Sequence, residues 1–98
     1  MPSMEDIRNA VVQTVSRYDI EEVYLYGSYA RGDQTEESDV DLRFLCGATM
    51  SFSQLLDIQE ELERELGTGL DIATAPPEQM RASFYNRIKD EEVLLYVA

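Results

Sequence analysis

From Asp39 onward the sequence alternates between charged and apolar side chains, and this alternation constrains the fold more than any other feature. Successive side chains of a β-strand point to opposite faces of a sheet, so the pattern predicts a strand over residues 38–46. Its apolar face, expected in the core, consists of Val40, Leu42 and Phe44. Asp39 and Asp41 share the other face, roughly 6–7 Å apart. At an effective dielectric constant of about 20 their carboxylates repel by about 2–3 kcal/mol, so either a cation separates them or one acid is protonated or paired.

Three further segments carry helical signals. They are residues 4–18, residues 52–66 and a segment that begins at Pro76-Pro77. Ser3 and Asp6 are spaced as a capping pair ahead of the first segment. Ser51 and Gln54 have the same spacing ahead of the second, and Gly67 is a typical stop after it. The first two helices are therefore expected to begin just after these serines.

The extended segments define the sheet. They are expected at 22–26, 38–46 and 69–73, with the type of the apolar run 93–97 left open. Only one possible helical turn (28–32) and a polar loop (33–37) join the first two strands. That is too little chain for a crossover, so we expect these strands to be antiparallel. A whole helix separates the second and third strands, which we expect to be parallel. The fold class is α+β, a small mixed sheet with helices packed on it.

The composition excludes several classes of site. The chain has 98 residues, enough for a single domain over 1–98. It has no histidine, which excludes Ser-His-Asp and Cys-His catalysis and every zinc site that uses imidazole. Its single cysteine, Cys46, excludes an internal disulfide and fits a reducing cytoplasm, where we expect the protein.

The charge balance restricts the partners. Eight basic and 20 acidic residues give a formal charge of −12, which disfavours binding of bulk nucleic acid and fits a basic protein partner. No apolar stretch approaches the roughly 18 residues of a membrane span, so no membrane association is expected.

A third carboxylate is expected beside the first two. Asp71 interrupts the apolar run of the third strand, where a charge is expensive unless it is paired or binds a metal. If the second and third strands are parallel, their starting ends lie together and Asp71 lies beside Asp39 and Asp41. Three oxygen donors without imidazole or thiolate suit Mg²⁺ or Mn²⁺. Two such ions, about 3.5–4 Å apart, would activate an attacking hydroxyl and neutralise a leaving pyrophosphate.

The Gly27-Ser28 turn is expected at the same edge of the sheet, because the first strand ends where the antiparallel second strand begins. Gly27 allows a ligand to approach the backbone closely. The amides that follow it and the Ser28 hydroxyl can bind phosphate oxygens, and Arg31 can add a charge-assisted contact. An anion-binding turn that faces a cluster of acids fits one ligand best, a metal-bound nucleoside triphosphate.

Each of these residues also has a purely structural explanation. The two aspartates of the second strand could form a solvated edge neutralised by Arg43, and Asp71 could be a capping residue. Gly27-Ser28 could be a plain strand-ending turn. Arg31 could pair with nearby acids, namely Asp33, Glu36 or Glu37. The combined spacing favours a catalytic or metal-binding role for the three aspartates.

The spacing also resembles a known family. Gly27-Ser28, ten residues and then Asp39-Val40-Asp41 resemble the nucleotidyltransferase superfamily typified by DNA polymerase beta. With residues 30–32 (Ala-Arg-Gly), Ser38 and the late Asp71 strand, the pattern is similar to the minimal nucleotidyltransferases of bacteria and archaea. The ending, residues 88–96, also looks like theirs, so the resemblance covers nearly the whole chain.

The resemblance implies a specific activity. Such proteins often pair with a HEPN-domain RNase toxin as its antitoxin, and they silence it by Mg²⁺-dependent transfer of AMP from ATP to a tyrosine. The site residues implied are Asp39, Asp41 and Asp71 for metal and catalysis, with Gly27, Ser28 and Arg31 for the nucleotide. Two alternatives stay open. One is a non-catalytic module of the same fold that neutralises a partner by binding, and the other is a nucleotidyltransferase acting on a small molecule or an RNA end.

Overall fold

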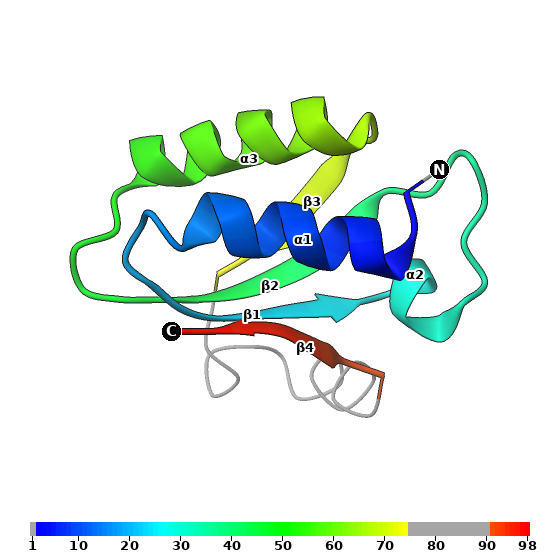
Figure 1. Cartoon of the computed structure of the whole chain (residues 1–98), viewed down its shortest axis with the longest axis horizontal. Coiled ribbons are helices and arrows are strands. Elements are labelled where there is room, and N and C mark those ends of the chain that lie inside the picture. Colours follow the sequence, from blue (N-terminus) through cyan, green and yellow to red (C-terminus); the bar gives the residue numbers. More distant parts are fainter. Residues whose placement is uncertain (1, 75–90) are drawn as a thin grey trace.

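The computed structural model describes residues 2–74 and 91–98. In these ranges, two long helices and one short helix pack with a four-stranded sheet. The elements are α1 (Met4–Val15), β1 (Ile20–Tyr26), α2 (Ser28–Arg31), β2 (Val40–Cys46), α3 (Phe52–Leu66), β3 (Leu70–Ala73) and β4 (Val93–Val97). Figure 1 shows α1 and α3 side by side along the sheet, with the short α2 at the end of β1. No helix in the described ranges is both long and apolar enough to cross a lipid bilayer.

The sheet has the strand order β3-β2-β1-β4. β1 and β2 are antiparallel and β2 and β3 are parallel, which confirms both predicted pairings. β4 pairs with β1 in the antiparallel sense, so the apolar run whose type was left open is a strand at one edge of the sheet. The predicted α+β class is therefore confirmed. The mixed topology brings the end of β1 and the starts of β2 and β3 to one side of the molecule.

The predicted caps explain where the helices begin. Ser3 with Asp6, and Ser51 with Gln54, form complete capping boxes, and each satisfies backbone N–H groups that the first turn leaves unpaired. α1 ends at Val15, three residues before the end of the predicted segment. There the chain tightens, because the Tyr18 amide donates to the Val15 carbonyl at 3.0 Å before β1 begins. The helix predicted at Pro76-Pro77 lies outside the described residues.

One face of the sheet holds the core. The three apolar residues of β2 are fully buried, as the alternation predicts: Val40, Leu42 and Phe44. They pack with β1, α1 and α3 through buried residues that include Val23, Leu25, Ile7, Val11, Ile58 and Leu62. Since side chains alternate along a strand, the opposite face of the sheet carries the charged residues of β2.

Candidate active site

β2 places Asp41 between two neighbouring strands. Asp41 is the register partner of Tyr26 in β1 and of Asp71 in β3. Paired strands lie about 4.8 Å apart, so the two aspartates sit on adjacent backbones on the same face of the sheet. The prediction that Asp71 lies beside Asp41 is confirmed. Asp39 lies two residues earlier on the same chain, just before β2 begins.

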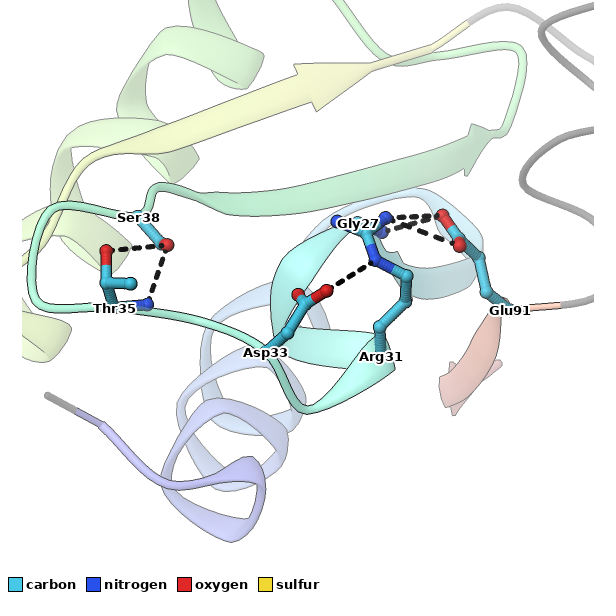
Figure 2. A network of polar contacts seen from close by, with 6 residues as sticks. All are labelled: Gly27, Arg31, Asp33, Thr35, Ser38 and Glu91. Atoms are coloured by element: carbon cyan, nitrogen blue, oxygen red, sulfur yellow. Dashed lines mark hydrogen bonds and ion pairs between the residues drawn. The ribbon is translucent and has the colours of Figure 1, made fainter.

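The loop before β2 positions Asp39. Ser38 folds back on Thr35: its hydroxyl accepts from the Thr35 amide at 2.9 Å and lies 3.4 Å from the Thr35 hydroxyl (Figure 2). The Ser38 amide also donates to the Thr35 carbonyl at 3.0 Å. The Asp39 carboxylate then lies against Gly69, where a Cβ atom would come within 2.7 Å of Oδ1. Gly69 thus makes room for Asp39, a role that the sequence analysis missed. The available signal was a glycine two residues ahead of the third aspartate.

Gly27 brings the turn against Asp41. Its backbone has φ 76° and ψ −154°, a conformation that is essentially restricted to glycine. A Cβ atom at this position would overlap Asp41 Oδ2 and lie 3.1 Å from Cγ. The Asp41 carboxylate is therefore packed on the backbone of the turn. The prediction that the Gly27-Ser28 turn shares an edge with the aspartates is confirmed.

The short helix α2 follows the turn directly. Ser28 is its first residue, and the Arg31 amide donates to the Gly27 carbonyl at 3.0 Å. Gly32 ends it in the left-handed conformation, with its amide bonded to the Ser28 carbonyl at 2.9 Å. The helical turn predicted at 28–32 is thus confirmed, and it carries Arg31 back toward the end of β1.

Negative charge accumulates at this edge. Partial burial raises the pKa of the Asp41 carboxyl, and the neighbouring charges of Asp71 and Asp39 raise it further, while Arg31 opposes them. Tyr26, which is buried, senses the same field. Burial, followed by the charges of Asp41 and Asp71, raises the pKa of its phenol to about 12. The charges of Asp39 and Asp71 therefore act on Asp41, and those of Asp41 and Asp71 act on Tyr26.

The donor chemistry of the three aspartates fits Mg²⁺, which prefers oxygen ligands. Within residues 2–74 and 91–98, however, no three acidic or cysteine side chains are arranged as a group that could hold a metal ion. Asp39 rests on Gly69 beside β3, whereas Asp41 rests on Gly27 beside β1. The backbone brings the aspartates together while the carboxylates turn to different sides. Metal binding by Asp39, Asp41 and Asp71 stays a prediction.

Arg31 has two carboxylate partners, which Figure 2 shows on either side of it. Its Nε donates to Asp33 Oδ2 at 3.2 Å, one of the structural pairings that the sequence allowed. Its Nη1 donates to Glu91 Oε1 and Oε2 at 3.3 and 3.4 Å. The Gly27 amide also donates to Glu91 Oε1, at 3.3 Å. Glu91 was not predicted from the sequence, because nothing in a linear pattern joins it to residues some sixty positions earlier.

A second arginine on this face is held by a buried ion pair. Arg43 donates to both carboxylate oxygens of Glu92, at 2.6 and 3.1 Å, and the two side chains are 5% and 8% exposed. Its guanidinium lies over the Tyr24 ring, 4.5 Å from the centroid. The structural explanation of the aspartates had Arg43 neutralising them; the structure shows that Arg43 forms an ion pair with Glu92.

Comparison with known proteins gives consistent results at the sequence level. Residues 9–98 match the family described as "Polymerase beta, Nucleotidyltransferase". Over 86 residues the chain is 40% identical to a candidate protein adenylyltransferase of Methanocaldococcus jannaschii, covering 83% of this chain and 80% of the relative. Over 56 residues it is 34% identical to the protein adenylyltransferase MntA of Thermococcus cleftensis, covering 57% of each.

Solved structures share the fold. A candidate minimal nucleotidyltransferase superposes with a TM-score of 0.76 at 24% identity, covering 92% of this chain and 90% of the other. A crystal structure of a toxin–antitoxin with AMP-PNP gives a TM-score of 0.74 at 18% identity, covering 93% and 73%. A tri-AMPylated Shewanella oneidensis HEPN toxin in complex with its MNT antitoxin gives 0.68 at 14% identity, covering 96% and 72%. At these identities the likeness concerns the fold.

Proposed function

Because the chain belongs to the polymerase beta nucleotidyltransferase family and is a nucleotidyltransferase, we propose that it is the antitoxin of a HEPN toxin–antitoxin pair. In this proposal it transfers AMP from ATP to a tyrosine of the toxin, in a reaction that depends on Mg²⁺. Relatives named as protein adenylyltransferases support a protein acceptor. Structural neighbours that are toxin–antitoxin complexes support the HEPN partner.

One observation of this chain carries the proposal. The Asp41 carboxylate lies against Gly27, while Asp41 and Asp71 are register partners on adjacent strands. One of the two acids that would bind a cation is therefore in direct contact with the turn that would bind phosphate. This juxtaposition is what a metal-bound triphosphate requires, because the cation must neutralise both the acids and the phosphates.

The roles follow from this placement. Asp39, Asp41 and Asp71 would hold the magnesium ions, and Gly27 and Ser28 would position the triphosphate with help from Arg31. When bound, magnesium supplies charge neutralisation at the leaving pyrophosphate and lowers the pKa of an attacking hydroxyl.

The proposed transfer is a single displacement at the α-phosphorus. The phenolic oxygen of the acceptor forms a new P–O bond to the α-phosphorus, and the bond to the pyrophosphate oxygen breaks. We assign the phenolic proton to Asp71, which is exposed and so can be reached by a side chain of another protein. The products are AMP-tyrosine and pyrophosphate.

The charge of the chain fits the proposed partner. A formal charge of −12 attracts a basic protein and repels free RNA, so the antitoxin would meet the RNase and avoid the substrate of the RNase. We place the pair in the cytoplasm, where the single cysteine would stay reduced.

A transfer assay tests this function. The chain is incubated with ATP labelled at the α-phosphate, Mg²⁺ and a candidate HEPN-domain toxin. We expect label on a toxin tyrosine, and we expect the double variant Asp39→Asn with Asp41→Asn to lose transfer by at least about a thousandfold. The matched control is Asp57→Asn with Glu60→Gln, which removes two exposed charges from α3 and should leave transfer unchanged.

The alternatives give different results in the same assay. If the double variant neutralises the toxin as fully as the unmodified chain does, neutralisation works by binding and not by transfer. The label could instead appear on a small molecule such as an aminoglycoside, or on an RNA end, with none on the toxin. In that case the labelled molecule, and not a protein, is the acceptor of AMP.

A further inference from the structure

Two groups assigned above to phosphate binding already share an anion in this structure. The Gly27 amide and the Arg31 guanidinium both donate to the carboxylate of Glu91, and the three N···O distances are 3.3, 3.3 and 3.4 Å (Figure 2). Glu91 belongs to a segment some sixty residues later in the sequence, just before β4. Its carboxylate therefore lies where the turn and Arg31 would meet an external anion.

The surroundings of Glu91 show that it belongs to the site. Its side chain is 18% exposed, compared with 61% for Asp33, the other partner of Arg31. The negative charge of Glu91 also acts on Asp41 of β2 and contributes to the raised pKa of that carboxyl. Glu91 is thus a half-buried anion that faces the same turn as the aspartates.

The backbone fixes the position of Glu91. Leu25 and Val93 are register partners in the β1–β4 pair, and just beyond this pair the Gly27 amide donates to the Glu91 carboxylate. The next residue, Glu92, is anchored by its buried ion pair with Arg43. The start of β4 is therefore held against the sheet, and only the side chain of Glu91 has to rotate for the turn to become available.

The contacts of Glu91 are also weak enough to be exchanged. Charge-assisted N–H···O bonds are strongest at about 2.7–2.9 Å. Glu92 meets this standard with its 2.6 Å contact to Arg43, whereas every Glu91 contact is 3.3 Å or longer. A triphosphate carries more charge and more acceptor oxygens than one carboxylate, so it can replace Glu91 at the same donors.

From this geometry we propose that Glu91 sets the affinity of the site for nucleotide, as an internal carboxylate that the triphosphate must displace from Gly27 and Arg31. The inference rests on the proposed function and deepens it. Glu91 acts through Arg31 and the turn, and has no part in the chemical step. It keeps the donors ordered while the site is empty, and it lowers the affinity by competing for them.

Calorimetric titration with ATP and Mg²⁺ tests this role. We expect Glu91→Gln to bind about three- to tenfold more tightly than the unmodified chain, since it loses the competing charge but keeps an acceptor for the Gly27 amide. Glu37→Gln is the matched control, with the same chemical change in the exposed loop, and we expect its Kd to stay within about twofold. Inorganic tripolyphosphate with Mg²⁺ should show the same gain, because the competition concerns phosphate and not the base.

Two further variants keep the test decisive. Glu91→Asp retains the charge on a shorter side chain that cannot reach both donors, and it should fall between the unmodified chain and Glu91→Gln. In an Arg31→Gln background, Glu91→Gln should tighten binding by less than it does alone, a coupling that a merely structural residue would not show.

The possible results separate this inference from the proposed function. If the unmodified chain binds ATP and Glu91→Gln binds it equally or more weakly, the nucleotide site stands and the role of Glu91 is overturned. A gain with ATP but none with tripolyphosphate also overturns it. If no protein in the series binds either ligand, both the inference and the proposed nucleotide site are wrong.

Discussion

Because Gly27 has no side chain, it can adopt a backbone conformation that other residues avoid, and it leaves space for a neighbouring carboxylate. Its backbone conformation, φ 76° and ψ −154°, is disfavoured for every residue that has a Cβ atom. The space that a Cβ atom would take is occupied by the Asp41 carboxylate. The glycine therefore lets the turn and the acid of β2 touch, and this contact joins the two halves of the proposed site.

The chain offers a matched test of this point. Gly27 and Gly32 flank α2 and both have positive φ, but a Cβ atom on Gly32 would meet no atom within 4 Å. We expect Gly32→Ala to cost about 1–2 kcal/mol of unfolding free energy and to retain transfer. Gly27→Ala should cost more, above about 2 kcal/mol, and should abolish transfer because Asp41 must move. Urea unfolding and the transfer assay measure both effects, and equal losses for the two variants would show that the contact with Asp41 is unimportant.

At this scale the sequence predicts the residues that a linear spacing can join. Gly27, Ser28, Asp39 and Asp41 lie within fifteen positions of one another, and strand periodicity is enough to bring them to one edge. Glu91 could not be found in this way, and the position of Gly69 two residues ahead of Asp71 does not by itself show that Asp39 packs on it. Their roles depend on the register of β3 and β4 against the rest of the sheet, which no local pattern encodes.

At the scale of elements, β4 pairs with β1 through backbone hydrogen bonds, and an ion pair links the residue before β4 to β2. Glu92 precedes β4 and reaches Arg43 on β2, so the ion pair crosses β1 and ties three strands together. Both side chains are nearly inaccessible to solvent, at 5% and 8% exposure, so the ion pair is buried. The pair therefore fixes the start of β4 and, with it, the position of Glu91.

Breaking this pair should destabilise the sheet. We expect Glu92→Gln to cost about 3–5 kcal/mol of unfolding free energy, because it removes one charge of a buried ion pair. Glu61→Gln is the matched control. It removes the partner of Arg17 on the surface, where Arg17 is 57% exposed, and should have a much smaller effect. Thermal or urea unfolding of the two variants checks this prediction, which fails if both lose the same stability.

The predictability of the elements differs for physical reasons. α1 and α3 were predictable because their capping boxes and apolar periodicity are local signals. β2 was predictable because charged and apolar residues alternate along it. The type of β4 was not, because Val93–Val97 is apolar throughout and its pairing with β1 shifts register between Val23 and Tyr24. That irregularity belongs to the pair of strands and leaves no mark in either sequence alone.

At the scale of the whole molecule, a small mixed sheet gathers acids that belong to separate strands. The antiparallel β1–β2 pair brings the turn to the start of β2, and the parallel β2–β3 pair brings Asp71 to the same edge. The charges of Asp71, Asp39 and Glu91 all raise the pKa of Asp41 there, and Arg31 opposes them. The negative charge at this edge would therefore stabilise a bound cation. In the proposed activity that cation is magnesium, which carries the triphosphate.

The central claim is that this edge holds metal ions on the aspartates and a triphosphate on the turn. The most direct measurement is a crystal structure with Mn²⁺ and a non-hydrolysable ATP analogue, in which anomalous scattering locates the metal. We predict manganese about 2 Å from carboxylate oxygens of Asp39 and Asp41, with Asp71 turned toward it and phosphate oxygens at Gly27 and Ser28. Metal bound elsewhere, or a triphosphate that lies away from the turn, would contradict the account.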